Sequence, residues 1–144
     1  MSNQPGFDKE TDVDVIFFDP AISYEETLKI ETKLKENYPN YSWELKNQVY
    51  MHIHNPNTEP YRDSRDAMSK YPERCTAIGL RLLDNDQLEL FAPYGLDDIL
   101  YFRVQPAPHF LTDPARKALY EQRLSKKIGR RSGTIFKLNF FKIF

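Results

Sequence analysis

The sequence has little cysteine, little glycine and no long hydrophobic run, and each shortage excludes a class of protein. Its single cysteine, Cys75, allows no intramolecular disulfide and no cysteine-based zinc cluster, so we expect a buried, inert thiol in a reducing cytoplasm. The five glycines form no glycine-rich phosphate loop, and no G-x-S-x-G motif occurs. The sequence shows neither a basic-then-apolar leader nor 18 consecutive apolar residues, so neither a signal peptide nor a membrane anchor is expected.

An excess of charge of one sign is also missing. Lys and Arg total 20 and Asp and Glu total 21, so no global field recruits nucleic acid or membrane, and specific DNA binding is not expected. The 144 residues suit one domain. We expect a disordered lead over residues 1–10, a folded domain over 11–128 and a basic, aromatic tail over 129–144, with strand composition at 135–141.

Hydrophobic periodicity predicts alternating strands and helices. Strands are expected over residues 12–18, 41–49, 76–83 and 87–92, with 51–54 continuing extended. Helices are expected over residues 23–36, 63–71 and 115–127, with one helical turn at 96–100. Residues 101–104 fit either a last short strand or an extension of that turn. The predicted fold class is α+β, a two-layer arrangement of a small mixed, mostly antiparallel sheet of four or five strands with three or four helices.

Two helix starts carry strong local signals. Ser23 followed by Glu26 forms a capping box, in which each side chain bonds the other residue's backbone N–H. Asp113 before Pro114 is an N-cap followed by proline at the first helical position. These signals fix where the first and last helices should begin.

Two carboxylates at the start of the first strand form the main candidate site. Side chains alternate faces along a strand, so Asp12 and Asp14 should point the same way, with their Cα atoms about 6.5 Å apart. Converging carboxylates suit Mg²⁺, which proteins often share between carboxylates and substrate phosphates. If the second strand lies near the first, Glu44 could join the pair. The alternative is that Asp12 is a turn residue and Asp14 a solvated edge residue.

Other polar side chains follow on the second strand and the segment after it. Lys46, Asn47 and Arg62 could contact phosphate or base, although Lys46 could instead pair with Glu44. If extended, His52 and His54 share one face and could ligate a transition metal or line a groove. His109 is expected in a loop, and Asp97 and Asp98 are expected to be helix caps.

Several segments occur together in an order that is specific to one group of proteins. They are Asp12-Val13-Asp14-Val15 with Phe18-Asp19, Trp43-Glu44-Leu45-Lys46-Asn47-Gln48, Met51-His52, Pro60-Tyr61-Arg62, Asp66-Ala67, Pro72-Glu73, Thr76-Ala77-Ile78-Gly79 and Ala92-Pro93-Tyr94-Gly95-Leu96-Asp97-Asp98. Together, over roughly residues 8–127, they resemble a bacterial nucleotidyltransferase-like family within the polymerase-β-type nucleotidyltransferase superfamily.

The resemblance implies a fold, an activity and a cofactor. It implies a small mixed sheet on which Asp12, Asp14 and, on the neighbouring strand, Glu44 hold Mg²⁺ or Mn²⁺. It implies transfer of a nucleoside monophosphate from an NTP to an unknown acceptor, which could be a small molecule, a protein or RNA. The candidate substrate-binding residues are Lys46, Asn47, His52 and Arg62.

The chain departs from the family pattern at both ends. About ten residues precede Asp12, without the helix and glycine-containing turn that bind the triphosphate, and the tryptophan-rich ending of the family is replaced. These departures predict a copy truncated at its N-terminus. They keep open a non-catalytic or degenerate domain that binds nucleotide or metal. A third possibility is a metal-dependent hydrolase that uses His52, His54 and an acid.

Overall fold

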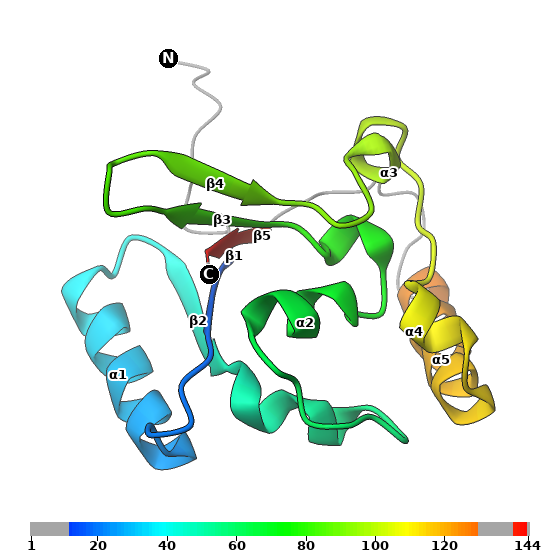
Figure 1. Ribbon diagram of the computed structural model, residues 1–144, viewed down its shortest axis with the longest axis horizontal. Coiled ribbons are helices and arrows are strands. Elements are labelled where there is room, and N and C mark those ends of the chain that lie inside the picture. Colours follow the sequence, from blue (N-terminus) through cyan, green and yellow to red (C-terminus); the bar gives the residue numbers. More distant parts are fainter. Residues whose placement is uncertain (1–11, 130–139, 144) are drawn as a thin grey trace.

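The computed structural model describes residues 12–129 and 140–143, and its described strands form one sheet (Figure 1). The strand order is β2 (Ser42–Asn47), β1 (Asp12–Phe17), β5 (Phe140–Ile143), β3 (Gly79–Leu82) and β4 (Leu88–Phe91). The helices are α1 (Tyr24–Asn37), α2 (Ser64–Ser69), α3 (Asp97–Leu100), α4 (Pro108–Leu111) and α5 (Pro114–Gly129), with 3₁₀ turns η1 (Gln48–His54) and η2 (Arg74–Thr76). This arrangement confirms the predicted α+β class. The predicted lead, residues 1–10, and residues 135–139 of the tail lie outside the described part of the chain.

The sheet is mixed, as predicted, but parallel pairing dominates it. β1 pairs parallel with β2 and with β5, and β5 pairs parallel with β3. Among the strand pairs that the structure describes, β3 and β4 alone run antiparallel. The expectation of a mostly antiparallel sheet was therefore wrong. A β–α–β crossover through α1 makes β1 and β2 parallel, and β5 enters between β1 and β3.

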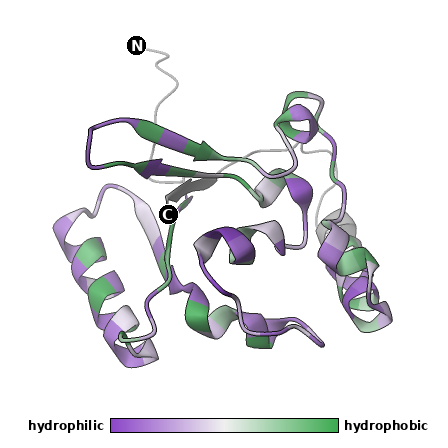
Figure 2. Ribbon diagram, in the orientation of Figure 1, coloured by the Kyte–Doolittle hydropathy of each residue, from purple (hydrophilic) through white to green (hydrophobic). Residues whose placement is uncertain are grey.

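Helix α1 begins at the predicted capping box and covers the edge strand β2. The Ser23 side chain accepts from the Glu26 backbone N–H at 3.1 Å, and Glu26 Oε2 accepts from the Ser23 N–H at 2.7 Å. Glu31 Oε2 accepts from the Leu45 N–H of β2 at 2.8 Å, so a helix side chain satisfies a donor on the strand's outer edge. Figure 2 shows short hydrophobic stretches separated by hydrophilic ones along α1.

The core is built from residues of the sheet, of the helices α2, α4 and α5, of the 3₁₀ turn η2 and of the loops between them. The buried apolar side chains are Val13, Ile16, Leu45, Tyr61, Ala67, Met68, Cys75, Ala77, Ala107, Phe110 and Tyr120. Cys75 is therefore a buried thiol, as expected. Asp113 caps α5 by accepting from the N–H groups of Ala115 and Arg116, which confirms the predicted start of that helix. None of the described helices is both long and apolar enough to cross a membrane.

Two predicted segments take different conformations. Residues 51–54 lie in the 3₁₀ turn η1 rather than in an extended strand. Residues 101–104 form neither a strand nor a longer helix, because Phe102 has a φ of 52° and ends α3 in the left-handed region. The Arg103 N–H then bonds the Asp98 carbonyl at 2.7 Å, which closes the turn. Asp98 is buried between Arg74 and Arg103 and is no helix cap.

A buried arginine fastens the loop after η1 to α4 and α5. Arg116 donates to the carbonyls of His109 and Asn57, at 2.7 and 2.6 Å, and to the Thr112 hydroxyl at 3.0 Å. His109, which lies in α4 rather than in a loop, is 2.9 Å from the Thr58 hydroxyl through Nε2. These contacts hold the loop that leads from η1 to Tyr61.

The loop fastening predicts a loss of stability in mild acid. Burial, together with the positive charge of Arg116, lowers the pKa of His109 below its usual value of about 6.5. At mildly acidic pH, His109 is therefore protonated more readily in the unfolded chain than in the folded chain. The free energy of unfolding should fall as the pH drops below about 6.5. Urea titrations at pH 7.5 and 5.5 should show a smaller acid loss for His109→Gln than for the parent chain. The exposed His54→Gln variant should lose as much as the parent, and an equal loss in all three proteins would contradict this prediction.

Candidate active site

A cleft of about 330 Å³ opens on the face of the sheet that carries the predicted acidic residues. β1 and β2 contribute the side chains of Asp14, Ile16, Glu44 and Lys46 to its lining. The remaining lining residues are Gln48, Met51, His54, Asn55, Tyr61, Tyr71, Pro72, Thr76 and Arg123. In the view of Figure 1, α2 lies between the β1–β2 pair and the α4–α5 pair. Residues from the sheet, from the loops on both sides of α2 and from α5 thus meet at one site.

Asp14 and Glu44 are neighbours across the two parallel strands. They are register partners, as are Ile16 and Lys46 two residues further on. Because register partners in a parallel pair point to the same face, both carboxylates face the cleft that they line. Two neighbouring carboxylates repel each other unless a cation or a proton donor lies between them. The backbone register therefore places Asp14 of the first strand next to Glu44 of the second.

Asp12 occupies a less central position. It is the first residue of β1, is exposed, and has Ser42 as its register partner on β2. Alternation puts it on the same face as Asp14, but it does not line the cleft. Over residues 12–129 and 140–143, no three His, Cys, Asp or Glu residues are grouped as a ready metal cage. Asp14 and Glu44 still fit Mg²⁺, which proteins commonly hold through one or two carboxylates while substrate phosphates and water complete the octahedron.

Two cations line the same cleft. Lys46 comes from β2, and Arg123 comes from the middle of α5. The described part of the chain contains no ion pair between Lys46 and Glu44, the alternative that the sequence left open. Within the same residues, neither side chain forms a hydrogen bond or an ion pair, although the positive charge of Lys46 acts on Glu31 and helps to lower the pKa of that carboxyl.

A buried glutamine and a tyrosine form a fixed polar pair in the cleft. Gln48 is 1% exposed, and its Oε1 accepts a hydrogen bond from the Tyr71 hydroxyl at 3.0 Å. Burial raises the pKa of Tyr71, and the negative charge of Asp14 raises it further, so this hydroxyl remains a proton donor. At 3.3 Å, Gln48 Nε2 donates to the Lys46 carbonyl, which anchors the end of β2. The pair holds the floor of the site in one conformation.

Asn47 has a structural place next to the cleft. Its Oδ1 accepts from the backbone N–H groups of Asp19 and Val49, at 3.2 and 3.3 Å. Its Nδ2 donates to the carbonyls of Asp19 and Ile22, at 2.8 and 3.2 Å. These four bonds use the hydrogen-bonding capacity of the amide and tie the loop after β1 to β2. Asn47 is 3% exposed and does not line the cleft.

The remaining sequence candidates are not brought together. His54 lines the cleft, whereas His52 packs edge-on against Tyr61 with ring centroids 6.2 Å apart. In a 3₁₀ helix of three residues per turn, side chains two positions apart point in different directions, so the expected shared histidine face was wrong. Arg62 has a highly exposed side chain, lies 3.5 Å from Asp66 and does not line the cleft.

Reasoning from sequence missed several residues of the site. Asn55, Tyr61, Tyr71 and Thr76 lie outside the two strands that carry the acids, and Arg123 belongs to a helix distant in sequence. Tyr61 and Thr76 do fall within the segments that carried the family resemblance, which is the one signal that points to them. For Arg123 the sequence offers one signal, the helical spacing from Leu119, which predicts that either Gln122 or Arg123 faces inward.

Comparisons with known proteins identify one family and one similar solved structure. A family model described as nucleotidyltransferase matches residues 1–132. A solved structure, described as an NMR structure that reveals a CCA-adding enzyme head domain, has 62% sequence identity and a TM-score of 0.78. The match covers 91% of this chain and 70% of that chain. The comparison with curated proteins found no match. The chain therefore belongs to the nucleotidyltransferase family.

Proposed function

We propose that this chain is a metal-dependent nucleotidyltransferase that moves a nucleoside monophosphate from an NTP to the hydroxyl group of an acceptor. The observation that carries the proposal is the register pairing of Asp14 with Glu44 on the face that lines the cleft. Two carboxylates side by side in a cleft that also contains cations match what a metal–triphosphate complex requires. Membership of the family supports the same reaction class.

The balance of the reaction defines what the residues must do. The acceptor oxygen forms a bond to the α-phosphorus, the bond from that phosphorus to the β-phosphate oxygen breaks, and pyrophosphate leaves. A divalent ion held by Asp14 and Glu44 would neutralise triphosphate charge and favour ionisation of the attacking hydroxyl. Asp12, on the same face, is the proposed third acid. Lys46 supplies a positive charge beside the acids, and the Gln48–Tyr71 pair keeps the β2 end of the cleft in place.

The acceptor that we propose to test first is RNA. The support for this choice is the description of the 62% identical structure as a CCA-adding enzyme head domain. Small molecules and proteins remain as parallel arms of the same test. In the part of the chain that the structure describes, the cleft is large enough for a nucleotide and opens to solvent, so an acceptor can approach it.

A labelling assay tests the proposed function directly. The chain is incubated with each of the four ribonucleoside triphosphates, labelled at the α-phosphate, with Mg²⁺ or Mn²⁺, and with RNA, protein or small-molecule acceptors. We expect label to enter one acceptor class, pyrophosphate to be released in equal amount, and EDTA to stop both. Release of pyrophosphate without labelled acceptor would indicate hydrolysis instead. Absence of both products over all three acceptor classes would refute the proposal.

A second candidate is a domain that binds nucleotide without turnover. The observation that favours it is that, within the described residues, no glycine lines the cleft, although family members use a glycine-containing turn to bind triphosphate. Calorimetry with Mg–ATP separates the candidates when it is combined with the labelling assay. Binding with no product favours the non-catalytic domain, and binding with product favours the transferase.

A further inference from the structure

A triphosphate bound in the cleft would need hydrogen-bond donors around its phosphates. Of the described glycines, Gly79 is buried in β3, Gly95 lies in a turn after β4, and Gly129 ends α5. None of the three lines the cleft. Backbone N–H groups exposed by a glycine turn therefore do not surround a triphosphate within the described part of the site. Within the described lining of the cleft, the positively charged donors come from the side chains of Lys46 and Arg123.

Arg123 is the side chain best suited to that role. It is the one described residue of α5 that lines the cleft, and its side chain forms no hydrogen bond or ion pair with the described residues. A guanidinium group offers a planar fork of N–H donors that matches two phosphate oxygens at once. Lys46 approaches the same volume from β2, beside the acids, as a compact single charge. The two cations come from separate elements, so a ligand between them would join β2 to α5.

We propose that Arg123 binds the terminal phosphates of the NTP, with Lys46 as the second cation. The inference rests on the proposed function, because it assumes that the cleft accepts a nucleoside triphosphate. The charge balance supports it. Asp14 and Glu44 would repel a triphosphate, while a divalent ion on these acids and the two cations would together offset its negative charge.

NMR titrations test the role of Arg123, because they measure affinities down to the millimolar range. The probes are Mg–ATP, AMP and inorganic tripolyphosphate. For Arg123→Gln we expect affinities for Mg–ATP and tripolyphosphate about tenfold or more below those of the parent chain, with affinity for AMP unchanged within twofold. Arg123→Lys should recover part of the loss, since it restores the charge but not the fork. Lys46→Gln should also weaken tripolyphosphate binding.

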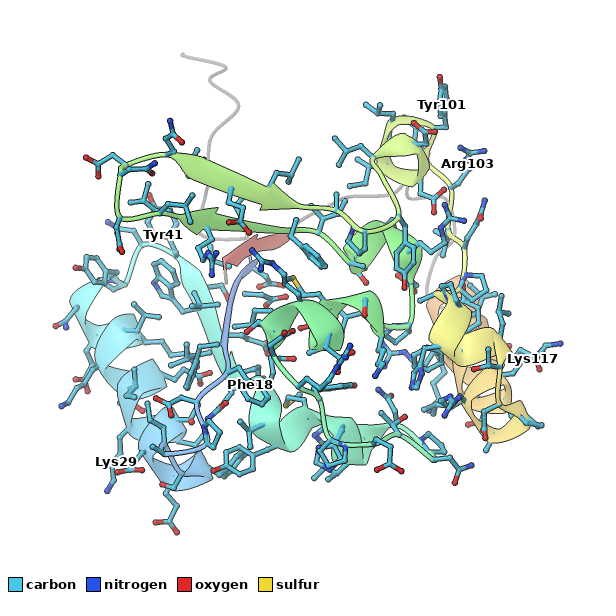
Figure 3. All side chains as sticks on the ribbon, in the orientation of Figure 1. Phe18, Lys29, Tyr41, Tyr101, Arg103 and Lys117 are labelled. Atoms are coloured by element: carbon cyan, nitrogen blue, oxygen red, sulfur yellow. The ribbon has the colours of Figure 1, made fainter. Side chains whose placement is uncertain are left out.

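Lys117→Gln provides the matched control. Lys117 lies on the same helix, is exposed, and points away from the molecule (Figure 3), so this variant removes one positive charge without touching the cleft. It should bind all three probes like the parent chain. If Arg123→Gln also binds Mg–ATP and tripolyphosphate like the parent, the inference about Arg123 is wrong while the proposed function stands. Equal losses for ATP and AMP would overturn it too, because they would indicate a general effect on the site.

The titration of the parent chain distinguishes the two failures. If the parent binds neither Mg–ATP nor tripolyphosphate at millimolar concentration, the proposed function fails and this inference fails with it. If the parent binds Mg–ATP, any result for Arg123→Gln bears on Arg123 alone.

Discussion

Replacing Asp14 by asparagine is expected to reduce the rate of nucleotidyl transfer by about a hundredfold or more. The substitution keeps the size of the side chain but removes the carboxylate that faces the cleft beside Glu44. Charge stabilisation by a metal lowers a phosphoryl-transfer barrier by several kcal/mol, and each 1.4 kcal/mol corresponds to a factor of about ten in rate. The measurement is the initial rate of label transfer at saturating Mg–NTP.

Controls separate this effect from loss of structure or of bulk charge. Asp97→Asn removes an exposed acid at α3, away from the cleft lining, and should leave the rate within twofold of the parent. Asp12→Asn tests the third acid: a rate equal to that of the parent would remove Asp12 from the proposed set. An Asp14→Asn variant that transfers label as fast as the parent would show that the site assignment is wrong.

The pairing of Asp14 and Glu44 also bears on stability. Like charges directly opposite each other on neighbouring strands disfavour the folded state. Glu44→Gln relieves that repulsion, so it should lower the transfer rate without lowering the midpoint of thermal unfolding. Loss of activity with retained or increased stability is typical of a residue kept for function.

Replacing Phe110 by alanine is expected to lower the free energy of unfolding by about 3–5 kcal/mol. Phe110 is 0% exposed and is among the largest fully buried side chains described. Its ring lies 6.3 Å from that of Tyr120, so it joins α4 to α5. Truncation removes the transfer free energy of the ring and leaves a cavity that the rigid surroundings only partly fill. Urea denaturation followed by circular dichroism measures the change.

The next residue provides the matched control for Phe110. Leu111 lies in the same helix turn but is 56% exposed, so Leu111→Ala should cost less than about 1 kcal/mol. A similar loss for both variants would mean that α4 is not anchored through the Phe110 ring. Because Arg123 lies on α5, the Phe110 variant should also weaken tripolyphosphate binding at temperatures where it remains folded.

The parts of the fold that sequence predicted are those with local causes. The capping box at Ser23, the Asp113 cap and the alternation around Asp14 act within a few residues, and the structure has each element where the pattern indicated. The strand pattern predicted Asp12 with Asp14 as the acid pair and Glu44 only as a residue that could join them. The pairing of Asp14 with Glu44 depends on the register between two strands that α1 separates, which the sequence did not define.

The parts that sequence did not predict depend on distant contacts. Residues 51–54 have the composition of an extended segment, yet they lie in the 3₁₀ turn η1, at whose start Asn47 Oδ1 accepts from the Val49 N–H. After α3, Phe102 adopts a positive φ, and the buried Asp98 is held by Arg74 from another segment. Arg123 lines the cleft because of how α5 packs, and the helical spacing from Leu119 could not decide between Gln122 and Arg123 as the inward-facing residue.

The position of β5 has a consequence for the order in which the chain folds. β5 lies between β1 and β3. Phe140 of β5 is the register partner of Asp12 of β1, so the two paired residues are separated by almost the whole chain. The β1–α1–β2 unit and the β3–β4 hairpin can each form early from local contacts, because little loop entropy opposes them. The two halves of the sheet can join only when residues 140–143 are available. During synthesis, the β1–α1–β2 unit that carries the acids would therefore be complete long before β5 joins it to the β3–β4 hairpin.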